Sequence, residues 1–142
     1  HQLTLALMRQ TDRAGVVSAM AATLEEDFAG DLVRIVLFKP VEGLDAQPWL
    51  QVIDRDAAVL RPFADALREG EPLCGRLHPD KQALLYGARV EEVESSALLA
   101  LEGTGLVAVG SADQNRFYPG MGTLFLRMMG EAFEVALRRF DG

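Results

Sequence analysis

Apolar positions in the first part of the chain follow helical spacing and then change to strand spacing. Residues 3–8 form a short apolar segment compatible with a helix. Over residues 13–28 apolar side chains recur at every fourth position, which predicts a helix with an apolar stripe, and Asp12 is a suitable N-cap. Gly30 then marks the end of that helix. Residues 32–38 are rich in β-formers and apolar on both faces, which is typical of a central strand covered on two sides.

The rest of the chain continues this alternation of strands and helices. The further elements expected are a strand at 49–53, a short helix at 58–69, a helix begun by Pro79 and Asp80, two short strands at 96–101 and 106–111, and a last helix from Pro119 or Thr123 to Phe140. The tight connection at 102–105 indicates a hairpin. Reading both strand-to-strand connections as hairpins predicts an antiparallel sheet. The fold class is therefore α+β, with the terminal helices on one face of the sheet and the middle helices and lid segment on the other.

The last helix has more apolar surface than one stripe requires. Its apolar positions can cover the sheet and still leave a face for a second subunit. We therefore expect a homodimer formed through the terminal helices. The alternative is that this helix is simply well buried within one chain.

Length and composition favour one domain. The chain has 142 residues, of which 49% are hydrophobic and 25% charged, as in an ordinary globular protein. A chain of this length buries roughly 68–70% of its unfolded surface, so it needs no disulfide or metal to fold. We expect a single domain over residues 1–142, with 1–11 as the end of a longer N-terminal helix, because the chain does not begin with methionine.

Charge and cysteine content restrict the partners and the compartment. The net charge of −7 argues against direct binding to nucleic acid or to an anionic membrane surface. The single cysteine, Cys74, allows neither an internal disulfide nor a multi-cysteine zinc site, and a reducing cytoplasm is its natural location. Neither a signal peptide nor an apolar run of the ~18 residues that a membrane span requires is visible.

Residues that could carry catalysis stand in unsuitable contexts. Ser111 follows Gly110 but lacks the second glycine of a nucleophile elbow and leads into a turn. His78 precedes a proline in a loop and is expected to be solvated. Cys74 has no second cysteine for disulfide exchange and is expected to be a packing residue, with a reactive or ligand-touching thiol as the alternative. We therefore expect no enzyme.

Patterns that suggest cofactors or metals also have plainer explanations. The glycines at 103 and 105 lead into a strand, whereas a phosphate-binding loop leads into a helix. Residues 120–123 stand at a helix start that can hold an anion, but backbone geometry alone accounts for them. The acids at 91, 92 and 94 lack the spacing of a metal-binding loop. No cofactor and no metal are expected.

Arg34 is the most informative charge because it interrupts an apolar strand. Strand alternation places Leu32, Val36 and Phe38 on its face. A buried arginine requires an anionic partner, which is either an internal carboxylate or a bound ligand. If a ligand binds, we expect its cavity between the sheet and residues 57–90. The residues expected around it are Arg34, Phe38, Trp49, Cys74, Arg76 and Ser96.

Three stretches of the sequence resemble a known family. They are residues 3–7, residues 72–77 and the closing stretch 105–123, which contains Asp113, Arg116-Phe117 and a Pro-Gly-Met-Gly-Thr segment. These stretches and the element order resemble GAF-like proteins of the bacterial family called domain of unknown function 484. The resemblance spans nearly the whole chain.

The resemblance implies a sensory or regulatory role without naming a ligand. A GAF domain covers one face of an antiparallel sheet with its middle segments. The Asn-Lys-Phe-Asp-Glu motif of cyclic-nucleotide-binding GAF domains is missing from this sequence, as are the several cysteines of the GAF-fold enzymes that reduce methionine sulfoxide. Genes of the family often lie near one for a tyrosine site-specific recombinase. We expect a non-catalytic cytoplasmic regulatory domain that binds an unknown small molecule, dimerises, or both. The alternative is a protein-interaction scaffold with no pocket, with such a recombinase as a possible partner.

Overall fold

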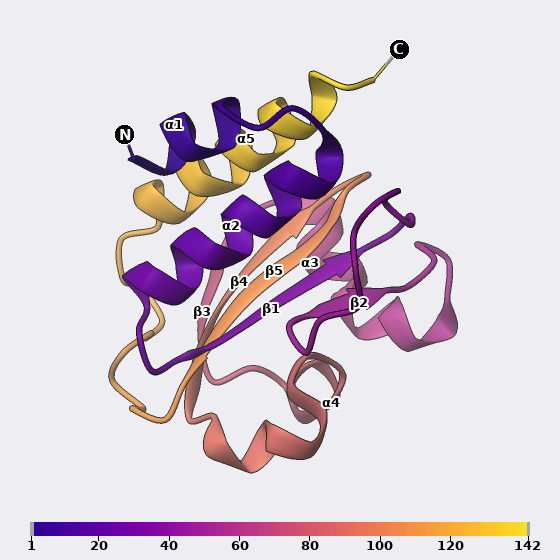
Figure 1. Ribbon diagram of the computed structural model, residues 1–142. Helices are drawn as coiled ribbons and strands as arrows, with labels where there is room; N and C mark the ends of the chain where they lie inside the picture. Colours follow the sequence, from indigo (N-terminus) through magenta and orange to yellow (C-terminus); the bar gives the residue numbers. More distant parts are fainter. Residues whose placement is uncertain (1, 142) are drawn as a thin grey trace.

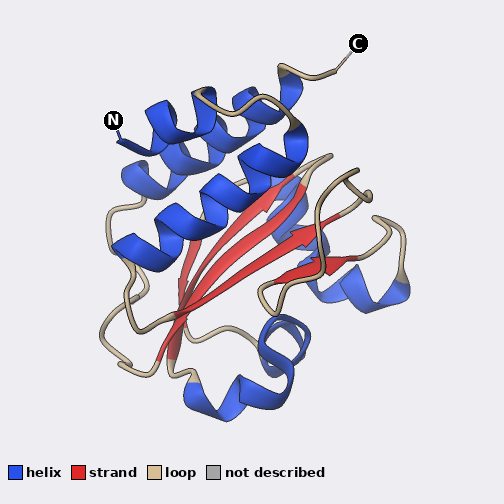
Figure 2. Ribbon diagram, viewed as in Figure 1, coloured by secondary structure: helices blue, strands red, loops and turns tan. Residues whose placement is uncertain are grey.

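The computed structural model describes residues 2–141 as a five-stranded sheet between two helical layers (Figures 1 and 2). The strand order is β2-β1-β5-β4-β3. In chain order the helices and strands are α1 (Gln2–Met8), α2 (Arg13–Asp27), β1 (Leu32–Leu37), β2 (Leu50–Val52), η1 (Ala58–Phe63), α3 (Ala64–Glu69), β3 (Leu73–Gly75), α4 (Pro79–Tyr86), η2 (Gly87–Glu92), β4 (Ser95–Leu101), β5 (Gly105–Ser111) and α5 (Leu124–Arg138), where η denotes a 3₁₀ helix.

Helices α1, α2 and α5 cover one face of the sheet, which we call the terminal-helix face. They lie together above the strands in Figure 1. Side chains of alternate strand residues, such as Ile35, Leu99 and Val107, form the core beneath them. The outermost helix, α1, inserts Leu3 and Leu7 into this core, and both side chains are buried.

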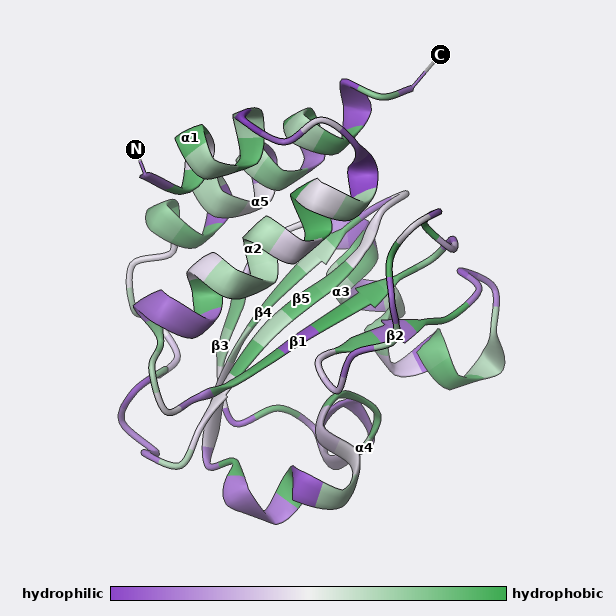
Figure 3. Cartoon of the chain, viewed as in Figure 1, coloured by the Kyte–Doolittle hydropathy of each residue, from purple (hydrophilic) through white to green (hydrophobic). Residues whose placement is uncertain are grey.

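The middle of the chain covers the other face of the sheet, which we call the lidded face. Elements η1, α3, α4 and η2 pack there against the intervening strand residues, such as Val36, Leu98 and Leu106. Hydrophobic colour runs along the strands and terminal helices in Figure 3, whereas hydrophilic colour gathers in the loops and on the outer turns of the middle helices. Every residue of β4 and β5 is buried, so both faces of the central strands are apolar, as the sequence predicts.

The observed sheet confirms the α+β, GAF-like class but is not purely antiparallel. Strands β5 and β4 pair antiparallel, as do β1 with β5 and β3 with β4, whereas β1 and β2 are parallel. The expectation that the β1–β2 connection is a hairpin is therefore wrong. A parallel pair needs a crossover connection of about a dozen residues. Residues 38–49 are long enough to bring the chain back to the end of the sheet at which β1 begins.

Two local features differ from the expected elements for identifiable reasons. The expected helix at 58–69 begins as the 3₁₀ helix η1, which contains Pro62, because proline has no N–H for the α-helical hydrogen bond. Strand β3 is not expected from the sequence, since its three residues show no alternation. Asp12 does cap α2, where its Oδ1 accepts a hydrogen bond of 2.7 Å from the Gly15 N–H, and Thr123 directly precedes α5.

The β4–β5 hairpin depends on a glycine at its return. A Cβ at Gly105 would lie 1.9 Å from the Val36 carbonyl oxygen of the neighbouring strand. No side chain can relieve this contact because the opposing atom belongs to the backbone of β1. Close approach of two backbones thus explains the residue type at position 105.

Replacing Gly105 with alanine should destabilise the fold by at least about 3 kcal/mol, because β1 and β5 must separate to admit the methyl group. The matched control is Gly122→Ala, since nothing lies within 4 Å of a Cβ there. Urea unfolding followed by circular dichroism measures both variants. Equal stability of the two would contradict the close packing of β1 against β5.

Candidate functional site

Tyr86 covers one end of the central strands β4 and β5 on the lidded face. It is the last residue of α4, it is 1% exposed, and its hydroxyl lies 2.7 Å from the Ser96 Oγ of β4. Burial raises the pKa of Tyr86 to about 12, although the Ser96 hydrogen bond and the charge of Arg34 oppose the shift. The phenol is therefore neutral at physiological pH and occupies the space above the strands.

The strands are shaped to receive this ring. Gly110 of β5 is the cross-strand partner of Ser96, and a Cβ at Gly110 would lie 2.7 Å from two carbon atoms of the Tyr86 ring. A glycine and a serine side by side on neighbouring strands thus provide the space and the hydrogen bond for one tyrosine. Ser96 is among the ligand residues predicted from the sequence, whereas its hydrogen-bond partner Tyr86 is not.

A second polar side chain is buried one helical turn before Tyr86. Gln82 is 5% exposed, and its Oε1 has no hydrogen-bond partner within the described residues. A buried acceptor without a partner costs about 1–3 kcal/mol. Such an unpaired group at the lidded face is suited to a molecule that can donate a hydrogen bond there.

Arg34 reaches the same face from the middle of β1. Its Nη1 donates a hydrogen bond of 2.9 Å to the Val33 carbonyl oxygen. None of the ion pairs of 4.0 Å or less among residues 2–141 includes Arg34. Partial burial lowers the pKa of Arg34, and repulsion from Arg89 adds to this effect. The nearest favourable carboxylate, Glu92, is instead held by two hydrogen bonds of 2.7 and 2.8 Å from Arg89.

Among the described residues, no carboxylate forms a direct ion pair with this arginine. The half-buried guanidinium therefore has free donors on the lidded face, and its charge acts on the Tyr86 hydroxyl. An anionic molecule is what such a group binds best.

The structure brings only some of the predicted ligand residues together. Arg34, Phe38 and Ser96 share the lidded face, although the buried Phe38 stands at the far end of β1 under the Arg55 guanidinium. Trp49 directly precedes β2 and Cys74 lies on β3, at opposite edges of the sheet, and both pack against the core of the terminal-helix face. Arg76 is exposed and forms an ion pair of 2.7 Å with Glu94. These six side chains therefore do not line one cavity.

The side chains considered for catalysis are either kept protonated or engaged in local hydrogen bonds. Burial raises the pKa of the Cys74 thiol, which keeps it protonated. His78 is exposed and its Nδ1 accepts a hydrogen bond of 3.2 Å from the Asp80 N–H, so it caps α4. The Ser111 Oγ accepts from the Asp113 N–H at 3.1 Å. Each of the three thus has a structural role.

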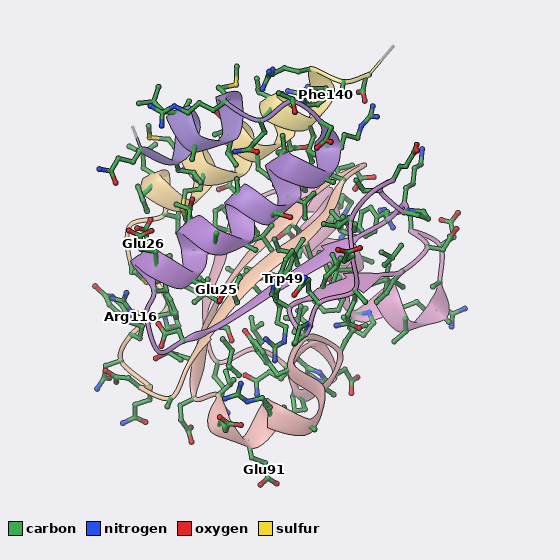
Figure 4. All side chains as sticks on the ribbon, viewed as in Figure 1. Glu25, Glu26, Trp49, Glu91, Arg116 and Phe140 are labelled. Atoms are coloured by element: carbon green, nitrogen blue, oxygen red, sulfur yellow. The ribbon has the colours of Figure 1, made fainter. Side chains whose placement is uncertain are left out.

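The acids near position 91 do not form a metal centre. Glu92 pairs with Arg89, Glu94 pairs with Arg76, and Glu91 points away from the sheet into solvent (Figure 4). Within residues 2–141, no group of three or more His, Cys, Asp or Glu side chains is placed to hold a metal ion. None of the helices formed by these residues has the length and hydrophobicity required to cross a membrane.

The space under the middle helices is filled by side chains, and a cleft opens on the other side of the sheet. Phe63, Leu67 and Tyr86 are almost fully buried beneath the lid. A cleft of about 800 Å³ lies instead between the loop at 39–43, the turn at 103–104 and the ends of the terminal helices. The expected position of the cavity, between the sheet and residues 57–90, is therefore not where this cleft lies. Four segments that are distant in the sequence form it, and their proximity cannot be recognised from sequence spacing.

Comparisons with known proteins bear on family and fold. The family model described as "Protein of unknown function, DUF484" matches residues 1–142. The crystal structure of the GAF domain of the cyanobacteriochrome TePixJ superposes with a TM-score of 0.60 at 16% sequence identity, covering 94% of this chain and 93% of that chain. Comparison with curated proteins gives no match. At this identity the structural likeness shows the fold alone, which is GAF-like.

The hydrogen bond between Tyr86 and Ser96 makes a measurable contribution to stability. Tyr86→Phe and Ser96→Ala should each lower the free energy of unfolding by about 1–2 kcal/mol, because each leaves a buried hydroxyl without its partner. The double variant should lose clearly less than the sum of the two. A double-mutant cycle in urea measures this coupling, and strict additivity would show that the two hydroxyls do not interact.

Proposed function

We propose that this chain, which belongs to the DUF484 family, is a non-catalytic cytoplasmic regulatory domain that senses a small anionic molecule at its lidded face and works as a homodimer. The observation that carries this proposal is Arg34, a half-buried guanidinium without a directly paired carboxylate in the described chain. The GAF-like fold supports a role in small-molecule sensing.

Other polar groups of the middle helices and of β4 support a polar ligand. Gln82 has a buried oxygen without a partner, and the hydroxyls of Tyr86 and Ser96 form one hydrogen bond that another donor or acceptor can replace. Binding here requires Tyr86 to leave the sheet, because its ring fills the space above Gly110.

The same packing favours a second candidate function. Since Tyr86, Phe63 and Leu67 fill the lidded face, the domain would serve equally well as an interaction scaffold without a ligand, with a site-specific recombinase as one candidate partner. A scaffold needs a stable surface, whereas a sensor needs a lid that opens. The response to anions separates the two.

An exposed apolar surface on the terminal helices supports the homodimer. Leu5 is 54% exposed on α1, while Leu124 and Met128 are 67% and 54% exposed on α5. Helices α1 and α5 lie side by side in Figure 1 and pack against each other. Apolar side chains gathered on two adjacent helices mark an association surface more often than a solvated one.

The state of the potential nucleophiles supports a non-catalytic role. The Cys74 thiol is kept protonated by burial, and the His78 ring is engaged at the start of α4. A single cysteine without a disulfide also suits a reducing cytoplasm.

Anion binding should depend on Arg34. We expect inorganic phosphate, citrate or a nucleoside monophosphate to stabilise the wild-type protein, by about 2.7 kcal/mol at a concentration one hundred times the dissociation constant. Arg34→Gln should abolish this stabilisation, whereas Arg76→Gln, which removes an exposed paired arginine, should preserve it. Thermal unfolding at constant ionic strength provides the measurement. No response in either protein favours the scaffold, and an equal response of wild type and Arg34→Gln would contradict the Arg34 site by placing the anion elsewhere.

Dimerisation should depend on the outer faces of α1 and α5. The double variant Leu5→Glu, Met128→Glu should be monomeric, because burying two carboxylates in an apolar interface is unfavourable. The control Val59→Glu replaces a residue of similar exposure, 53%, on the opposite side of the sheet and should remain dimeric. Size-exclusion chromatography with light scattering at micromolar concentration measures the mass. A monomeric wild-type protein would refute the dimer.

A further inference from the structure

The cleft of about 800 Å³ on the terminal-helix side is a second potential binding site, separate from Arg34. It is bounded by the start of α2, the loop at 39–43, the turn at 103–104 and the last turns of α5. Its volume is within the range of about 300–1,000 Å³ that is usual for small-molecule sites. Arg34, Gln82, Tyr86 and Ser96 are not among the residues that line it.

The floor of the cleft is apolar. Leu37 belongs to the core of the terminal-helix face and is 4% exposed, while Leu137 and Phe140 pack against the same core and remain partly accessible. These side chains form a surface for an aliphatic or aromatic group. An apolar part of a ligand therefore has a defined place.

Glu134 supplies a partly buried carboxylate whose hydrogen bond within the described chain is long. Its carboxylate accepts a long hydrogen bond of 3.4 Å from the Thr104 hydroxyl. Burial raises the pKa of Glu134, and Arg138 only partly opposes the shift. A carboxylate in this condition is stabilised by an incoming ammonium group.

Lys39 supplies a positive charge in the same cleft. None of the ion pairs of 4.0 Å or less among residues 2–141 includes Lys39. Arg13 is different, because it donates hydrogen bonds to the Asp141 carboxylate and the Phe140 carbonyl oxygen and so forms part of the fixed wall. The ammonium of Lys39 is thus available to a ligand carboxylate.

We infer that this cleft binds a zwitterionic amino acid or short peptide with an apolar side chain. Its ammonium group would face Glu134 and Thr104, its carboxylate would face Lys39, and its side chain would rest on Leu37, Leu137 and Phe140. A strongly anionic ligand such as a nucleotide polyphosphate fits less well, since Glu42 and Glu134 both line the cleft. The site lies beyond the proposed anion-sensing function and does not depend on it.

A set of related dipeptides tests the inference on the unmodified protein. Isothermal titration calorimetry compares Leu-Phe with N-acetyl-Leu-Phe, which lacks the ammonium group, and with Leu-Phe amide, which lacks the carboxylate. Leu-Phe should bind, and each blocked form should bind at least tenfold more weakly. No binding of Leu-Phe at millimolar concentration, or equal binding of all three, would overturn the inference.

Variants then assign each charge to a residue. Glu134→Gln should weaken Leu-Phe binding at least tenfold and should then bind the acetylated form as well as Leu-Phe. Lys39→Gln should also weaken Leu-Phe binding at least tenfold and should then bind the amide as well as Leu-Phe. Glu131→Gln, an exposed acid on the same helix outside the cleft, should bind Leu-Phe like the wild type. Unchanged affinity in Glu134→Gln would overturn the assignment. If Arg34→Gln lost Leu-Phe binding while Glu134→Gln and Lys39→Gln kept it, the peptide would bind at the lidded face, and the inference would be overturned. Failure of phosphate to bind would contradict only the proposed anion site.

Discussion

The structure depends on one constraint: the central strands are apolar on both faces, and both faces must be removed from water. All residues of β4 and β5 are buried, and the side chains at alternate positions belong to two separate hydrophobic cores, one on each face of the sheet. The hydrophobic effect therefore requires a helical layer on each side of the sheet. The chain meets this requirement with its terminal helices on one side and its short middle helices on the other (Figure 2).

The two layers are built differently, and the difference separates their roles. On the terminal-helix face α1 rests on α2 and α5, so the core is deep and the outer surface still carries apolar side chains. On the lidded face the helices are short, and polar groups lie among the apolar ones. Within residues 2–141, the Gln82 Oε1 has no hydrogen-bond partner, Arg34 has no directly paired acid, and the Tyr86 hydroxyl bonds to Ser96. These are the polar groups that the proposed ligand would use, and the proposal requires the short helices above them to open locally.

The sequence predicted what periodicity controls and missed what depends on contacts between distant segments. Alternation revealed the two-faced strands, and Asp12 correctly marked the start of α2. Strand β3 cannot be predicted because its three residues carry no periodic signal. The sequence therefore places Cys74 in the lid segment, although it packs against the core of the terminal-helix face. The parallel β1–β2 pair cannot be predicted because the sequence of a long loop does not show in which direction the next strand runs. Tyr86 and Glu134 have no distinctive motif, since their partners Ser96 and Thr104 come from other elements.

Amide hydrogen exchange of the free protein tests most directly whether the lidded face can open. The account predicts that amides of α4 and η2 (residues 79–92) exchange through local opening, with free energies well below that of global unfolding, while those of β1, β4 and β5 exchange only on global unfolding. Protection of residues 79–92 equal to that of the central strands would contradict the account. Tyr86 would then be a permanent part of the core, and the lidded face would have no place for a ligand.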